Sequence, residues 1–412
     1  MKVSILTLGC KVNQSESTII EGNLINNGFS IVGLSEQPDY SIINTCTVTA
    51  KSDYQSRQLI RRAVKSGSKV IVTGCYSQLK PNDINNIEGD ISVVSNMNKL
   101  HIINMLINNI KSITFNYSNR CRPYLKVQDG CNFRCTYCIV PKARGRSKSV
   151  DIKDVVMQAI ALEQAGFQEI VLTGIHLGLY GHDLIPKAKL SNLLKTLLKN
   201  TTICRIRLSS IEVKEVDNEL IELLKEQRIC KHIHIPLQSG DDTILNLMNR
   251  RYTIKDYVSI IDKILNKVPG IAVGTDVIVG FPGEGYNEFL NTKRLLDSMP
   301  IAYLHIFPFS TRPNTLASKM SNQNAHYIKK ERFNDLNALN IKKKRAYMLS
   351  HMNKTLDVII EEQRTDHTLI GTSSNYLKVR VPAKGYPKGS LVYVGVSKIE
   401  GDMLEGDCIV KL

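Results

Sequence analysis

The middle of the chain alternates short apolar runs with amphipathic stretches, and the alternation repeats six times. The apolar runs lie at 124–129, 169–174, 205–210, 232–237, 274–281 and 302–309. Stretches with the spacing of surface helices separate them, near 151–165, 189–199, 215–227, 254–267 and 285–298. This order predicts parallel strands joined by helical crossovers. Because no seventh or eighth unit is identifiable, it predicts a partial (β/α)6 barrel with its chemistry at the carboxyl ends of the strands.

The first hundred residues show the same alternation on a smaller scale. Strand-like runs at 2–8, 40–45 and 69–74 are separated by helical stretches around 16–27 and 52–65. This order predicts an open, Rossmann-like parallel sheet. The apolar N-terminal run is too short for a signal peptide and is typical of a buried first strand.

The last sixty or so residues contain only short strand-like runs with Gly turns, which predicts a small all-β barrel of oligonucleotide-binding type. A basic helix precedes them and carries Lys329, Lys330, Lys342, Lys343, Lys344 and Arg345. At 412 residues the chain exceeds one ordinary core. The predicted fold class is α/β with this small barrel at the C-terminus. The predicted domains are 1–112, 117–347 and 349–412.

The charge favours a polyanionic partner. Lys and Arg number 54 against 38 Asp and Glu, which gives a formal net charge of +16. Such an excess attracts nucleic acid through Coulomb forces and counterion release, although a generally basic surface gives the same number. No run approaches the roughly 18 apolar residues of a membrane span. We therefore expect no membrane partner and a cytoplasmic location.

Ten cysteines in a chain without a secretion signal favour metal binding over disulfides. Three of them, Cys131, Cys135 and Cys138, follow the first strand of the predicted barrel. Thiolates at this spacing can hold three corners of a four-iron cluster, and with no fourth cysteine nearby one iron stays open to another ligand. Zinc is the alternative, but zinc sites usually pair two CxxC units or add histidines. We therefore predict a 4Fe-4S cluster.

Three further cysteines each follow a strand of the predicted N-terminal sheet directly: Cys10, Cys46 and Cys75. Because the carboxyl ends of parallel strands share one edge of a sheet, we expect these three side chains at the same rim. The other four cysteines have no such pattern and are predicted to be small packed residues: Cys121, Cys204, Cys230 and Cys408.

The three segments in this order resemble a known enzyme family. The CxxxCxxC motif at 131–138 is similar to that of the radical S-adenosylmethionine (SAM) superfamily. A three-cysteine domain before such a core, and a small barrel like that at 356–412 after it, resemble the methylthiotransferases. The resemblance implies SAM as cofactor, a SAM-binding 4Fe-4S cluster, a second 4Fe-4S cluster on Cys10, Cys46 and Cys75, and a C-terminal TRAM domain.

Two short segments, TLGCKVNQ and NTCTVT, resemble the branch of the family that acts on N6-threonylcarbamoyladenosine at position 37 of tRNA. The residues that carry this resemblance are Lys11, Val12, Asn13, Thr47, Val48 and Thr49. The implied reaction forms the 2-methylthio derivative. The implied partners of a monomer are the tRNA anticodon loop and a reductant such as flavodoxin or ferredoxin. Alternatives are the isopentenyladenosine branch, the ribosomal-protein branch, a non-catalytic iron–sulfur RNA-binding regulator, and a zinc-binding RNA protein.

Candidate SAM contacts gather mainly at the ends of the predicted barrel strands: Tyr137, Thr173, Gly174, Ser209, Glu212, Gln238 and Gly283. Tyr137 could pack on the purine of SAM or simply within the loop, and glycines at strand ends also make ordinary turns. His232 and His234 share one face of a strand, where packing is favoured over metal ligation. No catalytic residue beyond the cluster ligands is predicted.

Overall fold

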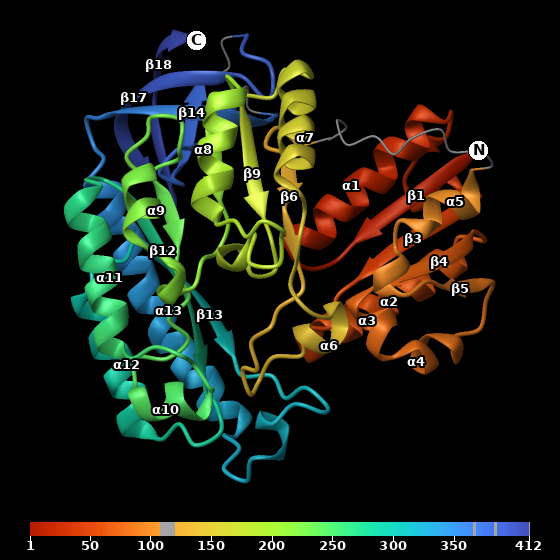
Figure 1. Cartoon of the computed structure of the whole chain (residues 1–412), viewed down its shortest axis with the longest axis horizontal. Coiled ribbons are helices and arrows are strands. Elements are labelled where there is room, and N and C mark those ends of the chain that lie inside the picture. Colours follow the sequence, from red (N-terminus) through yellow and green to blue (C-terminus); the bar gives the residue numbers. More distant parts are fainter. Residues whose placement is uncertain (108–119, 366–367, 383–384, 412) are drawn as a thin grey trace.

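The computed structural model describes residues 1–107, 120–365, 368–382 and 385–411, and it has three units (Figure 1). The N-terminal unit is a parallel sheet in the order β2-β1-β3-β4-β5 with helices on both faces. Its strands are β1 (Lys2–Thr7), β2 (Ser30–Ile31), β3 (Tyr40–Thr45), β4 (Lys69–Gly74) and β5 (Ile91–Val93). Its helices are α1 (Lys11–Asn26), α2 (Ala50–Lys65), α3 (Cys75–Leu79), α4 (Pro81–Asn85) and α5 (His101–Leu106).

Two apolar layers hold this sheet between its helices. Successive residues of a strand point to opposite faces, so Ile42 packs with Ile20 and Leu24 of α1, whereas Ile43 packs with Ile60 of α2. The three strands expected from the sequence are confirmed. The structure adds β2 and β5, which are too short to leave a period in the sequence.

The central unit is a half-barrel of six parallel strands in chain order, which confirms the predicted partial barrel. The strands are β6 (Tyr124–Lys126), β9 (Glu169–Thr173), β10 (Arg205–Leu208), β11 (His232–His234), β12 (Ala272–Val279) and β13 (Tyr303–Pro308). Hydrogen bonds from the Ile211 N–H to the His234 carbonyl and from the Cys230 N–H to the Ile206 carbonyl join the halves β6-β9-β10 and β11-β12-β13. The covering helices are α7 (Ile152–Gln164), α8 (Leu190–Asn200), α9 (Asn218–Leu223), α10 (Asp242–Leu247), α11 (Ile254–Lys267) and α12 (Tyr286–Ser298).

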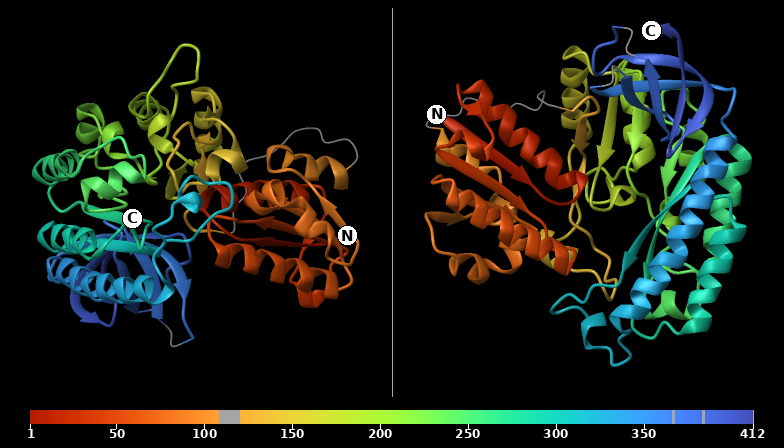
Figure 2. Two further views of the ribbon diagram at one scale, coloured as in Figure 1. Left: turned by 90° about the horizontal axis from the view of Figure 1, so that it is seen from below. Right: turned by 180° about the vertical axis from the view of Figure 1, so that it is seen from behind.

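A long helix, α13 (His326–Leu349), packs on β13 and leads into the C-terminal unit (Figure 2). That unit is a closed five-stranded barrel in the order β14-β15-β16-β18-β17, as the sequence predicts. Its strands are β14 (Thr355–Gln363), β15 (Thr368–Ser373), β16 (Lys378–Pro382), β17 (Leu391–Glu400) and β18 (Met403–Lys411). The expected boundary at 347 lies two residues before α13 ends, and those at 112 and 117 lie outside the described residues.

The C-terminal barrel closes the amino ends of the half-barrel strands, opposite the cysteine loop (Figure 1). Arg207 of β10 donates to the carbonyls of Ser373 and Ser374, and it is also bonded to the buried Glu169 at 2.7 Å. Tyr376 of the barrel stacks on His232 of β11, with ring centroids 4.4 Å apart. The end of the lumen next to the C-terminal barrel is therefore filled by side chains from two units.

The N-terminal unit covers the open side of the half-barrel, between β6 and the segment after β13 (Figure 2). Helix α1 packs against β6, and Arg312 from the segment after β13 pairs with Asp53 of α2 at 2.9 Å. The carboxyl ends of both parallel sheets thereby face one shared space. None of the described helices combines the length and the apolar character that a membrane crossing requires.

Candidate active site

The loop with Cys131, Cys135 and Cys138 leaves the half-barrel at β7 (Gln128–Asp129) and returns at β8 (Lys148–Ser149), after the short helix α6 (Val140–Arg144). Gly130 has a φ of +67°, and a Cβ there would lie 2.0 Å from the Arg146 carbonyl oxygen, so only glycine lets the two ends of the loop meet. All three thiols are free and within electrostatic range of one another. Three soft sulfur donors on one loop suit an iron–sulfur cluster with one open iron.

Two side chains that the sequence analysis missed contact these thiols. His176 Nδ1 lies 3.2 Å from Cys131 Sγ, and its other ring nitrogen bonds to Glu215. Arg250 Nη1 lies 3.3 Å from Cys135 Sγ. Both side chains are therefore placed to stabilise negative charge on these two sulfur atoms. His176 follows the end of β9, and this strand-end position was the available signal.

The second triad lies at the carboxyl edge of the N-terminal sheet, where the alternation predicts it. Cys46 and Cys75 are each 6% exposed, and Cys10 is exposed. Gly9 has a φ of +101°, and a Cβ there would lie 2.9 Å from the Cβ of Cys46. Burial raises the pKa of the Cys75 thiol to about 11. A metal ion that binds the Cys75 sulfur would therefore displace its proton.

A cavity of about 250 Å³ lies between the two cysteine-bearing edges and is walled by both units. Its lining includes Val48 and Thr49 from the segment after Cys46, and Tyr137 and Cys138 from the loop. From the half-barrel come Gln238, Asp276, Ile278, Phe307 and Phe309. The Ala50 N–H donates to Ser310 Oγ at 3.0 Å, which fixes the N-terminal unit to this wall. The structure thus places two residues of the NTCTVT segment directly at the cavity.

The structure gathers most of the candidate SAM contacts around the cysteine loop. Arg250 pairs with Glu212, and its Nη1 lies 3.5 Å from the Tyr137 hydroxyl. A Cβ on Gly174 would lie 2.8 Å from Gln128 Oε1, and Thr173 is buried next to it in β9.

Ser209 and Gly283 complete the set of candidates. Ser209 Oγ is buried without a hydrogen-bond partner among the described residues. Gly283 forms the turn after β12 with a φ of +85°, and a Cβ there would meet Leu247, which does not line the cavity.

Deeper in the lumen, toward the C-terminal barrel, three polar side chains from neighbouring strands contact one another: His234, Asp276 and His305. Asp276 Oδ1 lies 2.9 Å from His234 Nε2 and 3.2 Å from His305 Nδ1. Although burial raises it, the hydrogen bonds from these two histidines hold the pKa of Asp276 below its usual range. The ligand atoms of the three lie within 4.8 Å of one another, a spacing that could also hold a divalent cation. His232 and His234 both bond to the Tyr303 hydroxyl.

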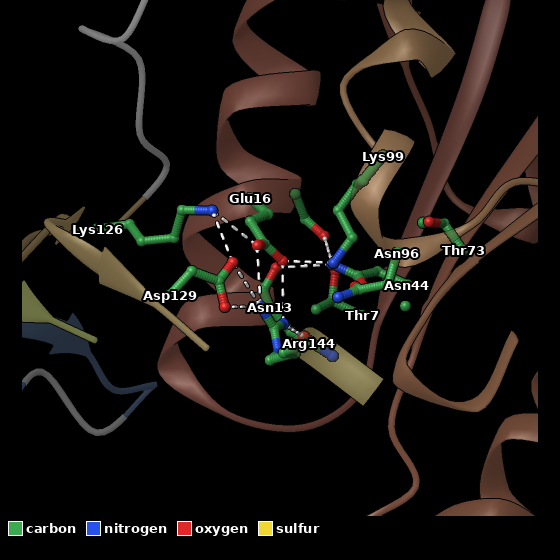
Figure 3. Close-up of polar contacts among 12 residues, drawn as sticks. Thr7, Asn13, Glu16, Asn44, Thr73, Asn96, Lys99, Lys126, Asp129 and Arg144 are labelled. Carbon is green, nitrogen blue, oxygen red and sulfur yellow. Dashed lines mark hydrogen bonds and ion pairs between the residues drawn. The ribbon is translucent and has the colours of Figure 1, made fainter. Parts of the chain in front are cut away.

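A buried charged cluster joins the N-terminal unit to the cysteine loop (Figure 3). Glu16 of α1 lies between three cations, with Lys126 at 2.9 Å, Arg144 at 3.1 Å and Lys99 also paired to it. Arg144 bonds further to Asp129 at 2.8 Å. Lys99 and Arg144 also lie within electrostatic range of Cys75, where positive charge favours a thiolate.

Comparisons with known proteins agree with this geometry. Residues 125–296 match the radical SAM superfamily, the class that the half-barrel and its cysteine loop define. Residues 2–95 match an uncharacterised protein family, UPF0004. A cobalamin- and cluster-containing radical SAM methyltransferase, TsrM from Kitasatospora setae, shares the fold with a TM-score of 0.56 at 14% identity, over 77% of each chain.

Sequence relatives narrow the class. The chain is 38% identical to the threonylcarbamoyladenosine tRNA methylthiotransferase MtaB of Aquifex aeolicus, over 96% of this chain and 100% of that one. It is 37% identical to MtaB of Bacillus subtilis, over 99% and 96%. With a tRNA-2-methylthio-N(6)-dimethylallyladenosine synthase of Alkaliphilus oremlandii the identity is 30%, over 99% and 93%. The chain belongs to the radical SAM tRNA methylthiotransferase family.

Proposed function

We propose that this protein converts N6-threonylcarbamoyladenosine at position 37 of tRNA to its 2-methylthio derivative. The observation that carries the proposal is the cavity between the two cysteine triads. Val48 and Thr49, from the segment that resembles the threonylcarbamoyladenosine branch, line it together with Tyr137 and Cys138 of the cysteine loop. The C2–H bond of adenine has no useful acidity at neutral pH, so the reaction needs cofactor radical chemistry. A base held in this cavity would contact Cys138 of the first triad and the residues that follow Cys46 of the second.

The proposed roles of the cysteines follow from their positions. Cys131, Cys135 and Cys138 would hold the SAM-binding 4Fe-4S cluster, and Cys10, Cys46 and Cys75 an auxiliary one. Held there, the two clusters would provide one-electron reduction of SAM and the sulfur of the methylthio group, and a second SAM would donate the methyl group. His176 and Arg250 stabilise thiolates of the first triad. Tyr137, Thr173, Gly174, Ser209, Glu212 and Gln238 surround the proposed SAM site, with Gly283 in a supporting turn.

The substrate base needs an aromatic or apolar surface once it leaves the anticodon stack. Phe307 offers one, because it lines the cavity at the end of β13 and is 45% exposed. We propose that the adenine stacks on this ring. The C-terminal barrel, as a TRAM domain, and the basic helix α13 would hold the anticodon arm through its phosphates. The proposed domains are those expected from the sequence, and the protein would act in the cytoplasm as a monomer with a flavodoxin or ferredoxin as reductant.

Mass spectrometry of tRNA nucleosides from cells with and without this protein tests the proposal. Loss of the methylthio derivative of threonylcarbamoyladenosine supports it, whereas loss of methylthio-isopentenyladenosine assigns the neighbouring branch. Anaerobic reconstitution with SAM and dithionite adds a second readout. Formation of 5′-deoxyadenosine is expected, and a cluster-loaded protein that forms none would be a non-catalytic regulator.

A further inference from the structure

Lys11 is the first residue of α1 in the N-terminal unit, and its side chain lies against residues of the half-barrel. It lines a polar cavity of about 200 Å³ together with Tyr124, Arg122, Arg207, Glu361 and Tyr376. This cavity is formed by all three units, since Arg207 comes from β10 and Tyr376 from the C-terminal barrel. Lys11 also belongs to the TLGCKVNQ segment, directly after Cys10.

The arginines of this cavity are already paired, but the lysine is not. Arg122 bonds to Glu361 at 2.6 Å and to Glu169 at 3.3 Å, and Arg207 bonds to Glu169 at 2.7 Å. Lys11 makes no hydrogen bond or ion pair with the part of the chain that the structure describes, although it is largely buried. Desolvation and the two arginines make a cation here unfavourable, and the more distant Glu169 and Asp276 offset this only in part, so an anion in direct contact would stabilise it.

An adjoining hollow lies next to the cavity around Lys11 and contacts the wall of the cavity between the cysteine triads. Asp276 lines the cavity between the cysteine triads and bonds to His305. His305 lines the adjoining hollow of about 240 Å³ with Tyr303, and Arg122 and Tyr376 belong to both this hollow and the cavity of Lys11. Lys11 itself lies within electrostatic range of Asp276. A group that extends from Asp276, at the wall of the cavity between the triads, toward Lys11 has to cover only the distance over which these two side chains interact.

We propose that Lys11 binds the carboxylate of the threonyl group that the substrate adenine carries on N6. This inference rests on the proposed function. C2 and C6 flank N1 of the adenine ring, so an N6 substituent leaves the base on a different side from the reacting C2. Among the residues that line the cavity, Glu361 is the one carboxylate beside Lys11, Arg122 and Arg207, so a carboxylate of the substrate would balance the remaining positive charge. An isopentenyl group supplies none and would leave the ammonium unpaired, so Lys11 selects between the two bases.

A backbone phosphate of the tRNA is the other anion that could reach Lys11, and the test separates the two. Cluster-loaded wild-type protein and Lys11→Met are each titrated with one tRNA carrying either threonylcarbamoyladenosine or unmodified adenosine at position 37. Both tRNAs have the same phosphates. Lys255→Met is the matched control, because it removes one exposed lysine charge from the outer helix α11.

In the wild type we expect the hypermodified tRNA to bind about 10- to 100-fold more tightly than the unmodified one, the effect of one charged hydrogen bond. Lys11→Met should reduce this ratio to near 1, whereas Lys11→Arg and Lys255→Met should largely retain it. If Lys11→Met weakens both tRNAs equally, Lys11 holds a phosphate and the inference is wrong. An unchanged ratio in Lys11→Met overturns it as well.

A substrate-side measurement covers the case in which Lys11→Met fails to load its clusters. The free nucleoside and its carboxyl methyl ester are compared as competitors against wild-type protein. The ester should compete about 10-fold or more weakly if the carboxylate is recognised. Equal competition contradicts the inference alone. A wild type that methylthiolates no threonylcarbamoyladenosine contradicts the proposed function instead.

Discussion

At the scale of the residue, substitution of single cysteines should separate SAM cleavage from methylthiolation. Cys46 is buried at the rim of the N-terminal sheet, whereas Cys135 lies in the half-barrel loop beside Arg250. We expect Cys46→Ala to retain SAM cleavage and to lose methylthiolation, and Cys135→Ala to lose both. Chromatography of 5′-deoxyadenosine and mass spectrometry of the tRNA measure the two activities. A folded Cys46→Ala protein that retains its first cluster but cleaves no SAM would contradict this division.

Phe307 provides a second prediction for a single side chain. Stacking of a base on an aromatic ring contributes about 1–3 kcal/mol, so Phe307→Ala should raise the KM for tRNA by roughly 5- to 150-fold. Because the ring is 45% exposed, the melting temperature should change little. Phe307→Tyr should restore binding. Tyr286→Ala on α12, 70% exposed, is the control for loss of a surface ring. Equal effects of the two alanine variants would argue against stacking in the cavity.

Helix α1 carries the next prediction, at the scale of the element. Glu16 pairs with Lys99, Lys126 and Arg144 where α1 meets β6, α6 and the segment before α5 (Figure 3). Glu16→Gln would leave the buried Lys99 without its carboxylate partner, whereas Lys126 and Arg144 keep Asp129. Breaking such a buried pair costs about 3–5 kcal/mol.

We expect Glu16→Gln to lower the urea midpoint and to weaken retention of the auxiliary cluster beside Cys75. Urea unfolding and iron analysis measure the two effects. Glu88→Gln, an exposed glutamate of the same unit, should leave both unchanged. If the urea midpoint of Glu16→Gln equals that of the wild type, water molecules replace the lost carboxylate and the expected cost is absent.

At the scale of the whole molecule, Glu169 connects the half-barrel to the C-terminal barrel through Arg205 and Arg207. Burial by itself would raise the pKa of Glu169, but the two arginines hold that pKa well below its usual range. A carboxyl group with a lowered pKa in the folded state stabilises the fold above its unfolded pKa of about 4.3, and this contribution is lost as the pH falls toward the folded value.

Stability should therefore decrease on acidification below about pH 4.3. Glu169→Gln should be less stable than the wild type at pH 7, and the difference should narrow below about pH 4. Urea midpoints of both proteins across this range measure it. A difference that is constant with pH would show that the carboxylate charge does not contribute.

Sequence alone determined the elements and their order, because strand and helix periods and the turns at strand ends are local properties. The six-strand alternation, the cysteines after strands and the five short C-terminal strands all appear as predicted. Parallel topology even placed Cys10, Cys46 and Cys75 at one rim without any contact being known. The charge of +16 indicated a polyanionic partner but no position for it.

Only the tertiary structure decided which units face each other. His176, Arg250 and Asp276 act through residues tens of positions away, and no local pattern marks such pairs. The same holds for Lys11, which the sequence identified as a signature residue next to a cysteine. Its neighbours Arg122, Arg207 and Tyr376 come from the other two units. The position of each cysteine directly after a strand fixed where the cysteines gather, because that is a local property of the chain. The packing of the three units against one another decided which side chains line the cavities, because those side chains are far apart in the sequence.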